Sequence, residues 1–222
     1  MRTHGRKNGY VTEGQEERLR RWLPEIGLGR EQRLATAGYA NKLPVVLEIG
    51  IGCGEFLAFE AVNHPEWNFL GAEIYLPGIA KAVSYLEEAG VMERIRITQL
   101  PAQFVLEHQV ADGELHGAYI NHPDPWPKAR HHKRRIIQKN FAEQLVRKLE
   151  PGGFIKLASD IEELAIWMRD ILDATPGLKN LGVADGFIPR EEGRIVTKFE
   201  GRGDRAGRIS RFMHYIKTGD GQ

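Results

Sequence analysis

A regular alternation of short apolar runs with longer amphipathic stretches, from about residue 44 to residue 182, constrains the fold of this chain most. The apolar runs have the length of buried β-strands, and the apolar residues between them recur at helical spacing. Such an alternation predicts a parallel sheet with helices on both faces. We therefore expect an α/β fold, doubly wound and Rossmann-like, whose mostly parallel seven-stranded sheet ends in an antiparallel late strand.

The same pattern gives approximate bounds for the elements. The predicted strands are residues 44–49, 68–74, 94–98, 117–121 and 154–159, followed by a late strand over 208–218. The predicted helices are residues 53–62, 77–89, 101–109, 135–149 and 160–174. Asp160 is placed to cap the last of these helices. We expect two parts, a basic arm with a short helix around residues 16–23 in 1–33 and the main domain over 34–222.

Charge is distributed unevenly although the formal net charge is only +1, from 31 cations and 30 anions. Residues 1–33, 123–149 and 190–211 together carry 23 cations and 11 anions, a net charge of +12, and the rest of the chain carries −11. An asymmetry of this size indicates a polyanionic partner, although basic runs can also be solvated faces. Residues 183–207 form a Gly/Arg-rich connection that is long enough to suggest a function.

Several classes of protein are excluded by composition. A single cysteine, Cys53, excludes a disulfide framework and a cysteine-based zinc site. No apolar run approaches the ~18 residues of a membrane span, and no signal peptide is recognisable. His122, His131 and His132 lack a regular ligand spacing, so we expect no metal. The expected protein is cytoplasmic and has no membrane contact.

A glycine-rich turn follows the first predicted strand with the spacing Glu48-x-Gly50-x-Gly52-x-Gly54. Glycines let a backbone bend sharply and approach a ligand closely. Glu73 ends the next strand, where a carboxylate can accept both hydroxyls of a ribose. The dinucleotide fingerprint G-x-G-x-x-G is not matched, and Glu48 beneath the turn would repel a pyrophosphate. The pattern favours a nucleoside cofactor that carries an ammonium and a sulfonium group, as in the class I S-adenosylmethionine-dependent methyltransferases that it resembles.

A second unusual segment, Asn121-His122-Pro123-Asp124-Pro125-Trp126-Pro127, follows the fourth predicted strand. Ligands of open α/β sheets bind beyond the carboxyl ends of strands, and the prolines on both sides restrict Asp124. Five cations follow within eight residues: Lys128, Arg130, Lys133, Arg134 and Arg135. Cations at a helix N-terminus oppose the helix dipole, and a bound phosphate would relieve that conflict. The alternative interpretation is a proline-rich surface turn before a basic helix.

This segment resembles the signature of the tRNA (guanine-N7)-methyltransferases of the TrmB family. Thr197-Lys198-Phe199-Glu200-x-Arg202 is similar to the carboxy-terminal motif of that family, and Asp160 matches a further position. Arg2-x-x-Gly5-Arg6 resembles its basic amino-terminal arm. The resemblance covers nearly the whole chain. It implies the class I methyltransferase fold and methyl transfer from S-adenosylmethionine to N7 of guanine 46 in the variable loop of tRNA.

The resemblance also implies roles for individual residues. Glu48, Glu73, Asn121 and Asp124 would line the cofactor and catalytic site, and Lys128, Asp160, Thr197 and Glu200 would contact tRNA. Phe199, followed by Arg202, would either stack on a base or anchor its loop. The chain has Pro101-Ala102-Gln103 where many relatives have an adenine-contacting Asp, so Gln103 is a substitute candidate, and His122 stands where Phe is common.

The expected chemistry assigns Asp124 a catalytic role without proton transfer. Guanine N7 carries a lone pair and no proton, so no general base is required. A fixed carboxylate can bond the N–H donors of the base and offset the positive charge that develops on the purine. The main alternative is a non-catalytic RNA-binding protein that retains the fold. A nicotinamide-dependent dehydrogenase and a DNA or protein methyltransferase fit the motifs less well, and the chain could be a monomer or a homodimer.

Overall fold

The computed structural model describes residues 10–219, which fall into two compact units, one ending at Ala111 and the other beginning at Asp112. The seven strands described have the order β3-β2-β1-β4-β5-β7-β6, in which the first three belong to the first unit and the last four to the second. None of the helices described over residues 10–219 is long and apolar enough to cross a membrane.

The first unit contains the parallel strands β1 (Val45–Ile49), β2 (Asn68–Ala72) and β3 (Ile95–Thr98). Its helices are α2 (Glu55–Asn63), α3 (Leu76–Glu88) and the short α4 (Ala102–Phe104), with single 3-10 turns at Leu34–Thr36 and Met92–Arg94. Every residue of β2 and β3 is buried, as expected for parallel strands covered on both faces. The predicted strands and helices of this unit are confirmed to within two residues, apart from the helix over 101–109 and the helix around 16–23, which is longer than expected.

That predicted helix is α-helical only at its start. Residues Val105–Gln109 form a π-helical turn, so the α-helix expected over 101–109 is partly wrong. The buried side chain of Gln109 donates from Nε2 to the carbonyl oxygens of Gly29 (2.7 Å) and Gln32 (3.2 Å). The π-helical turn thus ends at Gln109, whose side chain bonds to the backbone of the segment after α1.

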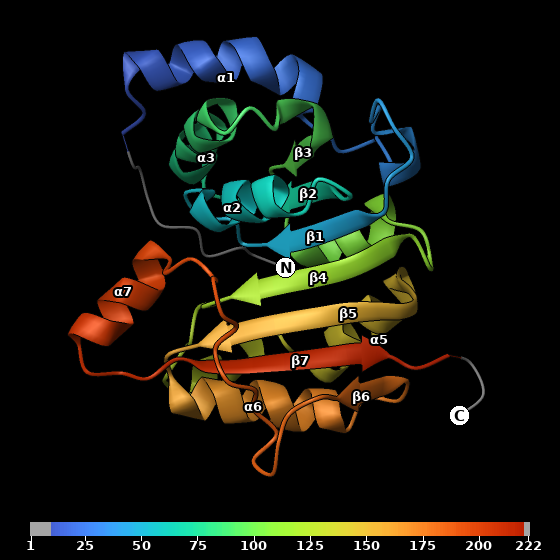
Figure 1. Ribbon diagram of the computed structural model, residues 1–222, viewed down its shortest axis with the longest axis vertical. Helices are drawn as coiled ribbons and strands as arrows, with labels where there is room; N and C mark the ends of the chain where they lie inside the picture. The colour runs from blue at the N-terminus through green and yellow to red at the C-terminus, as the bar shows by residue number, and fades with distance from the viewer. Residues whose placement is uncertain (1–9, 220–222) are drawn as a thin grey trace. The chain divides into compact units, whose positions relative to one another are not determined.

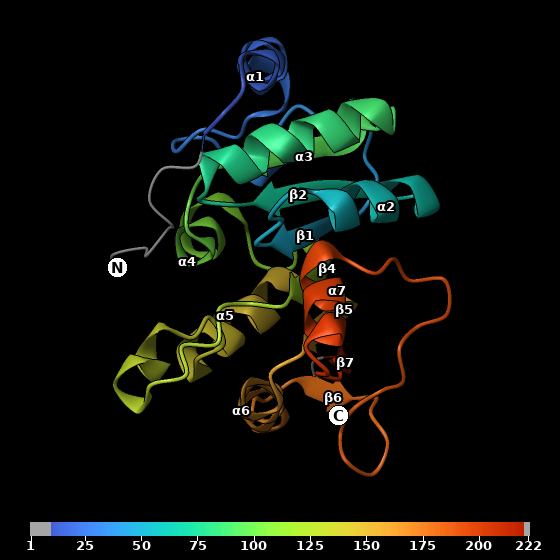
Figure 2. The ribbon, with the colours of Figure 1, turned by 90° about the vertical axis from the view of Figure 1, so that its left-hand side faces the viewer.

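Helix α1 (Glu13–Ile26) packs against α3 in the first unit and crosses it (Figures 1 and 2). It is longer than expected because Thr12 and Gln15 form a capping box before its first turn. The carboxylate of Glu87 on α3 accepts hydrogen bonds from Arg18 Nε (3.0 Å) and Trp22 Nε1 (2.9 Å). The boundary between residues 1–33 and 34–222 stays a prediction, and the arm residues Arg2, Gly5 and Arg6 lie outside the described residues.

The second unit is built on β4 (Leu115–Asn121), β5 (Leu149–Ser159), β6 (Leu178–Asn180) and β7 (Arg211–Lys217). Strands β4 and β5 are parallel, and β7 is antiparallel to both β5 and β6. The antiparallel late strand is therefore confirmed. Strand β6 was missed because three residues are too short to show a periodicity.

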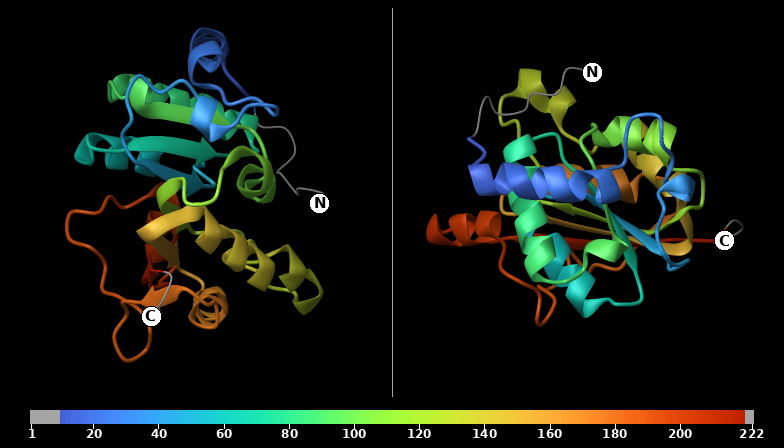
Figure 3. Two further views of the ribbon diagram at one scale, coloured as in Figure 1. Left: turned by 90° about the vertical axis from the view of Figure 1, so that its right-hand side faces the viewer. Right: turned by 90° about the horizontal axis from the view of Figure 1, so that it is seen from above.

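Helices α5 (Lys139–Lys148) and α6 (Glu162–Asp173) cover one face of these four strands, and the connection after β6 crosses the opposite face (Figures 2 and 3). Helix α7 (Lys198–Arg205) lies beyond the carboxyl ends of β4 and β5 (Figure 1). The long connection expected over residues 183–207 thus contains a helix, and it brings the carboxy-terminal motif to the end of β4.

The helix expected to begin at residue 135 begins at Lys139 instead. Residues Ala129–Arg134 form a separate 3-10 helix, and Gln138 has extended backbone angles before α5. Arg135 and Ile137 are both buried, which requires their side chains to point inward at a spacing that a continuing helix would not give. The clustered cations therefore do not lie in the first turn of an α-helix, and the argument from the helix dipole does not apply to them.

Asp160 does not cap the helix that follows it. Helix α6 begins after Ile161, and the Ser159 hydroxyl accepts the hydrogen bond of the Ile161 amide (3.1 Å). Asp160 Oδ2 accepts instead from Arg208 Nε at 2.7 Å. An ion pair with a residue 48 positions away has replaced the local cap, which no local pattern could indicate.

Candidate functional site

The glycine turn of the first unit has the left-handed backbone for which its glycines are needed. Gly50, Gly52 and Gly54 have φ values of 76°, 54° and 78°, a region that favours glycine. A Cβ on Gly54 would lie 2.4 Å from the Cβ of Ala82, so this glycine lets α3 pack against the turn. A Cβ on Gly50 would meet no atom within 4 Å, so the turn presents open backbone there to a ligand.

Two carboxylates support this turn. Glu48 is buried on β1, 2% exposed. Glu73, after β2, accepts a hydrogen bond from the Gly52 amide (2.9 Å) and from the amides of Ile74 (2.8 Å) and Tyr75 (2.9 Å). These bonds fix the direction of the Glu73 carboxylate relative to the turn. Gln103 is half-buried in α4, which follows β3.

In the second unit the backbone after β4 is sharply bent on both sides of Asp124. His122 (φ 47°) and Trp126 (φ 43°) are the non-glycine residues with a left-handed backbone among those described. Such a conformation costs of order 1–3 kcal/mol and persists only where the surroundings impose it. Together with Pro123 and Pro125 it holds the exposed Asp124 in a narrow range of directions, as expected from the sequence.

Arg135 supports this loop from inside. Its side chain is 1% exposed, its Nε donates to the Pro125 carbonyl oxygen (3.0 Å), and its Nη2 donates to Glu163 (2.8 Å). Its guanidinium also lies 4.9 Å from the ring centroid of Trp167. The arrangement makes Arg135 a structural residue of the loop and argues against the phosphate contact that we expected for it.

The other four cations of the segment face outward. Lys128, Arg130 and Lys133 are exposed, and Arg134 is half-buried with its guanidinium 4.9 Å from the Trp126 ring centroid. The phosphate contact expected for these four residues stays a prediction.

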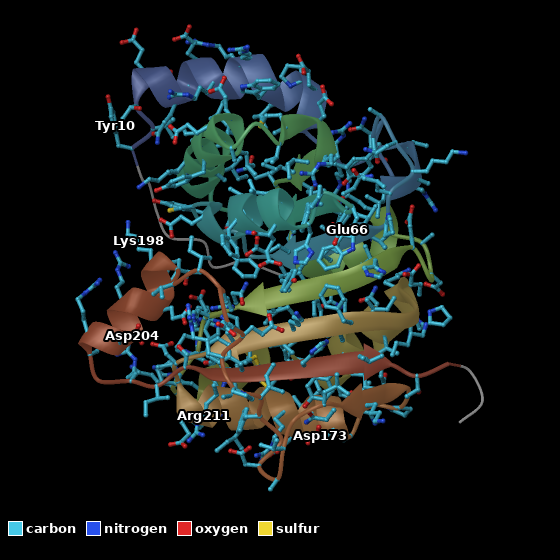
Figure 4. The ribbon with its side chains drawn as sticks, viewed as in Figure 1. Tyr10, Glu66, Asp173, Lys198, Asp204 and Arg211 are labelled. Carbon is cyan, nitrogen blue, oxygen red and sulfur yellow. The ribbon has the colours of Figure 1, made fainter. Side chains whose placement is uncertain are left out.

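The carboxy-terminal motif is a helix start, not the loop that we expected. Thr197 is buried and caps α7 by accepting from the Glu200 amide (3.2 Å). Phe199 is 46% exposed, so the alternative of a buried anchor is wrong. The Arg202 guanidinium lies 5.9 Å from its ring centroid. Lys198 and Asp204 mark this helix in Figure 4.

Glu200 is buried, 3% exposed, between two arginines that the sequence analysis left unassigned. Arg190 Nε donates to one carboxylate oxygen (2.9 Å) and Arg194 Nη1 to the other (2.7 Å). Arg194 Nη2 also donates to Asn121 Oδ1 at the end of β4 (3.0 Å). The structure therefore joins Asn121 to the Thr197–Glu200 motif through Arg194. In the sequence, only the position of Arg194 in a basic segment next to this motif could have indicated its role.

Asp160 lies beneath the same helix. A Cβ on Gly203 of α7 would lie 2.6 Å from Asp160 Oδ2, so only a glycine lets the helix approach this carboxylate. Burial lowers the pKa of the neighbouring His122, an effect that the charge of Asp160 partly opposes. Asn121, His122, Asp160 and Glu200 thus belong to one polar cluster of the second unit.

The strand order with an antiparallel β7, the glycine turn and its two carboxylates define a class I S-adenosylmethionine-dependent methyltransferase. Solved structures share this fold. The antibiotic-resistance methyltransferase Kmr matches with a TM-score of 0.52 at 16% identity, over 81% of this chain and 89% of that chain. A 16S rRNA (adenine(1408)-N(1))-methyltransferase variant from Catenulisporales acidiphilia, with cosubstrate SAM, gives 0.53 at 13% identity, over 81% and 88%.

Sequence comparison gives the family. A family model described as "Putative methyltransferase" matches residues 42–212. A tRNA (guanine-N(7)-)-methyltransferase of Cronobacter sakazakii is 41% identical over 93% of this chain and 87% of its own length. That of Alkalilimnicola ehrlichii is 40% identical over 98% and 92%. The chain belongs to the tRNA (guanine-N7)-methyltransferase family, the TrmB family, which confirms the resemblance found in its sequence.

Proposed function

We propose that this protein transfers a methyl group from S-adenosylmethionine to N7 of guanine 46 in the variable loop of tRNA. The observation that carries the proposal is the connection from Asn121 through Arg194 to Glu200. It joins the end of β4, where a doubly wound sheet binds ligands, to the carboxy-terminal motif that marks the family. The expectations of a monomer or homodimer and of a cytoplasmic location stay predictions.

The first unit has features that fit S-adenosylmethionine. The open backbone of Gly50 would receive the cofactor, with the buried Glu48 carboxylate beneath to favour its positive charge. The Glu73 carboxylate, oriented by three of the about four hydrogen bonds that a carboxylate can accept, would accept one ribose hydroxyl. We retain Gln103 as the candidate for the adenine. The cofactor supplies an electrophilic methyl group on a sulfonium.

Asp124 would hold the guanine. Its exposed carboxylate can accept hydrogen bonds from the N–H donors of the base and offset the positive charge that spreads into the ring as N7 is methylated. The rigid backbone around Asp124 fixes the base for an in-line displacement. Pre-alignment of this kind can supply ~7–11 kcal/mol of a bimolecular barrier.

The basic surface would bind the tRNA backbone. Lys128, Arg130, Lys133 and Arg134 face outward and would contact phosphates, and Phe199 beside Arg202 offers an aromatic face to an unpaired base. Thr197, Asp160 and Glu200 are committed to contacts within the unit. We propose that these three residues shape the tRNA-binding surface by holding α7 in place.

Mass spectrometry of a tRNA incubated with the protein and S-adenosylmethionine tests the proposal. Nuclease digestion should yield 7-methylguanosine from the variable-loop fragment, and a transcript with adenosine at position 46 should yield none. Calorimetry with S-adenosylmethionine separates the enzyme from the alternative of a non-catalytic RNA-binding protein, for which no heat of cofactor binding is expected. Methylation of another base or another atom would contradict the proposal.

Asp124→Asn and Asp124→Ala, assayed under single-turnover conditions at saturating cofactor, test the catalytic residue. We expect a loss of about 10²-fold, similar to the removal of one preorganised group that stabilises transition-state charge. Near wild-type rates in both variants would remove Asp124 from the mechanism.

A further inference from the structure

In the side-chain amide of Asn121, the oxygen has a hydrogen-bond partner and the nitrogen has none among the described residues. Its Oδ1 accepts from Arg194 Nη2 at 3.0 Å. Its Nδ2 is buried, and no residue in the described part of the chain accepts a hydrogen bond from it. A buried donor without an acceptor is destabilising, so such groups in native structures commonly mark a place that a ligand or a water completes.

The orientation of this amide follows from the chemistry of its neighbour. The oxygen and nitrogen of an asparagine are assigned from their partners, and a guanidinium has donors only. The atom that faces Arg194 must therefore be Oδ1, and the atom that faces away must be Nδ2. Arg194 is itself held by Glu200 (2.7 Å) and lies over the Phe212 ring, 5.0 Å from its centroid. Asn121 is thus fixed as a hydrogen-bond donor.

The surroundings of Asn121 are unusually rich in unused polar atoms. Both ring nitrogens of the next residue, His122, are also buried without a hydrogen-bond partner among the described residues. On the sheet face, Asn121 and Arg194 line a cavity of about 20 Å³, enough for about one water, together with Tyr119, Ile188, Glu191 and Phe212. The exposed lining is mostly apolar, so a planar base can pack there beside the Asn121 amide only after the chain that covers the cavity is displaced.

We propose that Asn121 Nδ2 donates a hydrogen bond to O6 of the target guanine and that Arg194 is the positioning residue that orients it. The inference rests on the proposed function, because guanine carries O6 beside N7 on the edge that is methylated. Adenine presents an amino donor at the same place, which would face the Asn121 donor without an acceptor. The contact would therefore select guanine, whereas Asp124 would bond the opposite edge of the base.

Base entry requires displacement of the chain that covers this donor, because the cavity as it stands holds about one water. Ile188 and Glu191 line the cavity from the connection that crosses the sheet face, and Glu191 is held to Lys156 on β5 by an ion pair of 2.6 Å. Between Pro189 and Val196 the described backbone hydrogen bonds are limited to Arg194 N to Glu191 O at 3.3 Å. Arg190 and Arg194 are anchored to Glu200 by their side chains, so the part of this stretch that can move to admit a base is the turn between them, residues 191–193.

The test uses a tRNA that carries guanosine, 6-thioguanosine or inosine at the methylated position. 6-Thioguanosine replaces O6 by a poor acceptor and keeps N1–H and the amino group, and inosine keeps O6 and lacks the amino group. Single-turnover rates are compared for the wild type, for Asn121→Asp, which keeps the shape and the Arg194 contact but has no donor, and for the uncharged Asn121→Ala. Intrinsic reactivities of the bases cancel when the ratio of two rates is compared between enzymes.

We expect the guanosine-to-6-thioguanosine rate ratio to be about tenfold larger for the wild type than for either Asn121 variant, as for one lost hydrogen bond. The guanosine-to-inosine ratio should be the same in all three proteins. Arg194→Lys should lower the first ratio toward that of Asn121→Ala. Arg190→Ala, which removes the other arginine of Glu200, should leave it unchanged.

An unchanged guanosine-to-6-thioguanosine ratio in both Asn121 variants would overturn the inference and leave Asn121 a structural residue. In that case the wild type still forms 7-methylguanosine, and the proposed function stands. If the wild type forms no 7-methylguanosine on the unmodified tRNA, the proposed function and this inference both fail.

Discussion

Arg135 and Lys133 lie two residues apart in one basic run, and the structure predicts opposite consequences for their loss. Arg135→Met keeps most of the apolar stem and removes the guanidinium from its buried position. The lost bond to the Pro125 carbonyl is worth about 1 kcal/mol, and the contact with the Trp167 ring about another 1 kcal/mol. Glu163 is 60% exposed and stays hydrated, so solvent screens its ion pair with Arg135 and the loss of that pair adds little.

The expected destabilisation of Arg135→Met is therefore about 2 kcal/mol, measured as the change in the free energy of unfolding in urea. Lys133→Ala should change this free energy by less than about 0.5 kcal/mol, because its side chain is exposed. For the salt dependence of tRNA binding, we expect the larger effect from Lys133→Ala and little effect from Arg135→Met. Each lost phosphate contact lowers the slope of log K against log salt by ~0.7–0.9, so Lys133→Ala should reduce the slope and Arg135→Met should not.

The two measurements together decide the assignment. An Arg135→Met protein with wild-type stability and a salt slope reduced by about one contact would refute the structural role of Arg135. It would return that residue to the phosphate-binding set that the sequence suggested.

Three further changes have defined outcomes. Gly54→Ala, with φ at 78° and a Cβ 2.4 Å from that of Ala82, should lower the unfolding free energy by about 3 kcal/mol, and Gly50→Ala, at a similar φ in open space, by about 1 kcal/mol; equal losses would contradict the packing role of Gly54. Because burial lowers the pKa of His122, the folded protein binds this proton less readily than the unfolded chain. Its contribution to stability is therefore intact above the ordinary pKa of 6.5 and is lost as pH falls below it, so His122→Phe should flatten the decline of the urea midpoint between pH 7.5 and 5.5. Thr197→Ala should cost about 1 kcal/mol in the same assay and Thr197→Ser much less, since only the hydroxyl cap is required; equal effects would exclude the cap.

Much of the fold was predictable from local patterns. Strands β1 to β4 are short apolar runs bounded by turn residues, and the strongly periodic helices α3 and α6 were found to within two residues. Strand β5 was found only from Phe154 onward, because its first residues, Leu149 to Gly153, include a Pro-Gly-Gly sequence that is typical of a turn. Late strand β7 was found as well, because a final apolar run after a polar connection has few other places in such a sheet.

The differences have a common cause in contacts between residues far apart in the chain. Asp160 is a residue type that is favoured at N-caps, but its carboxylate accepts a hydrogen bond from Arg208, 48 residues later. In the sequence, Arg135 resembles the other cations of a basic run. In the structure, contacts with Glu163 and Trp167, about 30 residues later, hold it buried, where it supports the loop around Asp124. Arg194 carried no motif of its own, and its importance follows only from Asn121, 73 residues earlier.

The bent backbone on both sides of Asp124 has a consequence for how a substrate is recognised. Two left-handed residues and two prolines leave the segment from His122 to Trp126 little conformational entropy to lose when RNA arrives. A loop that is already ordered can bind quickly, but it adapts poorly to a nucleotide of a different outline. Selectivity in this part of the protein should therefore come from exclusion of misshapen bases, with little contribution from induced fit.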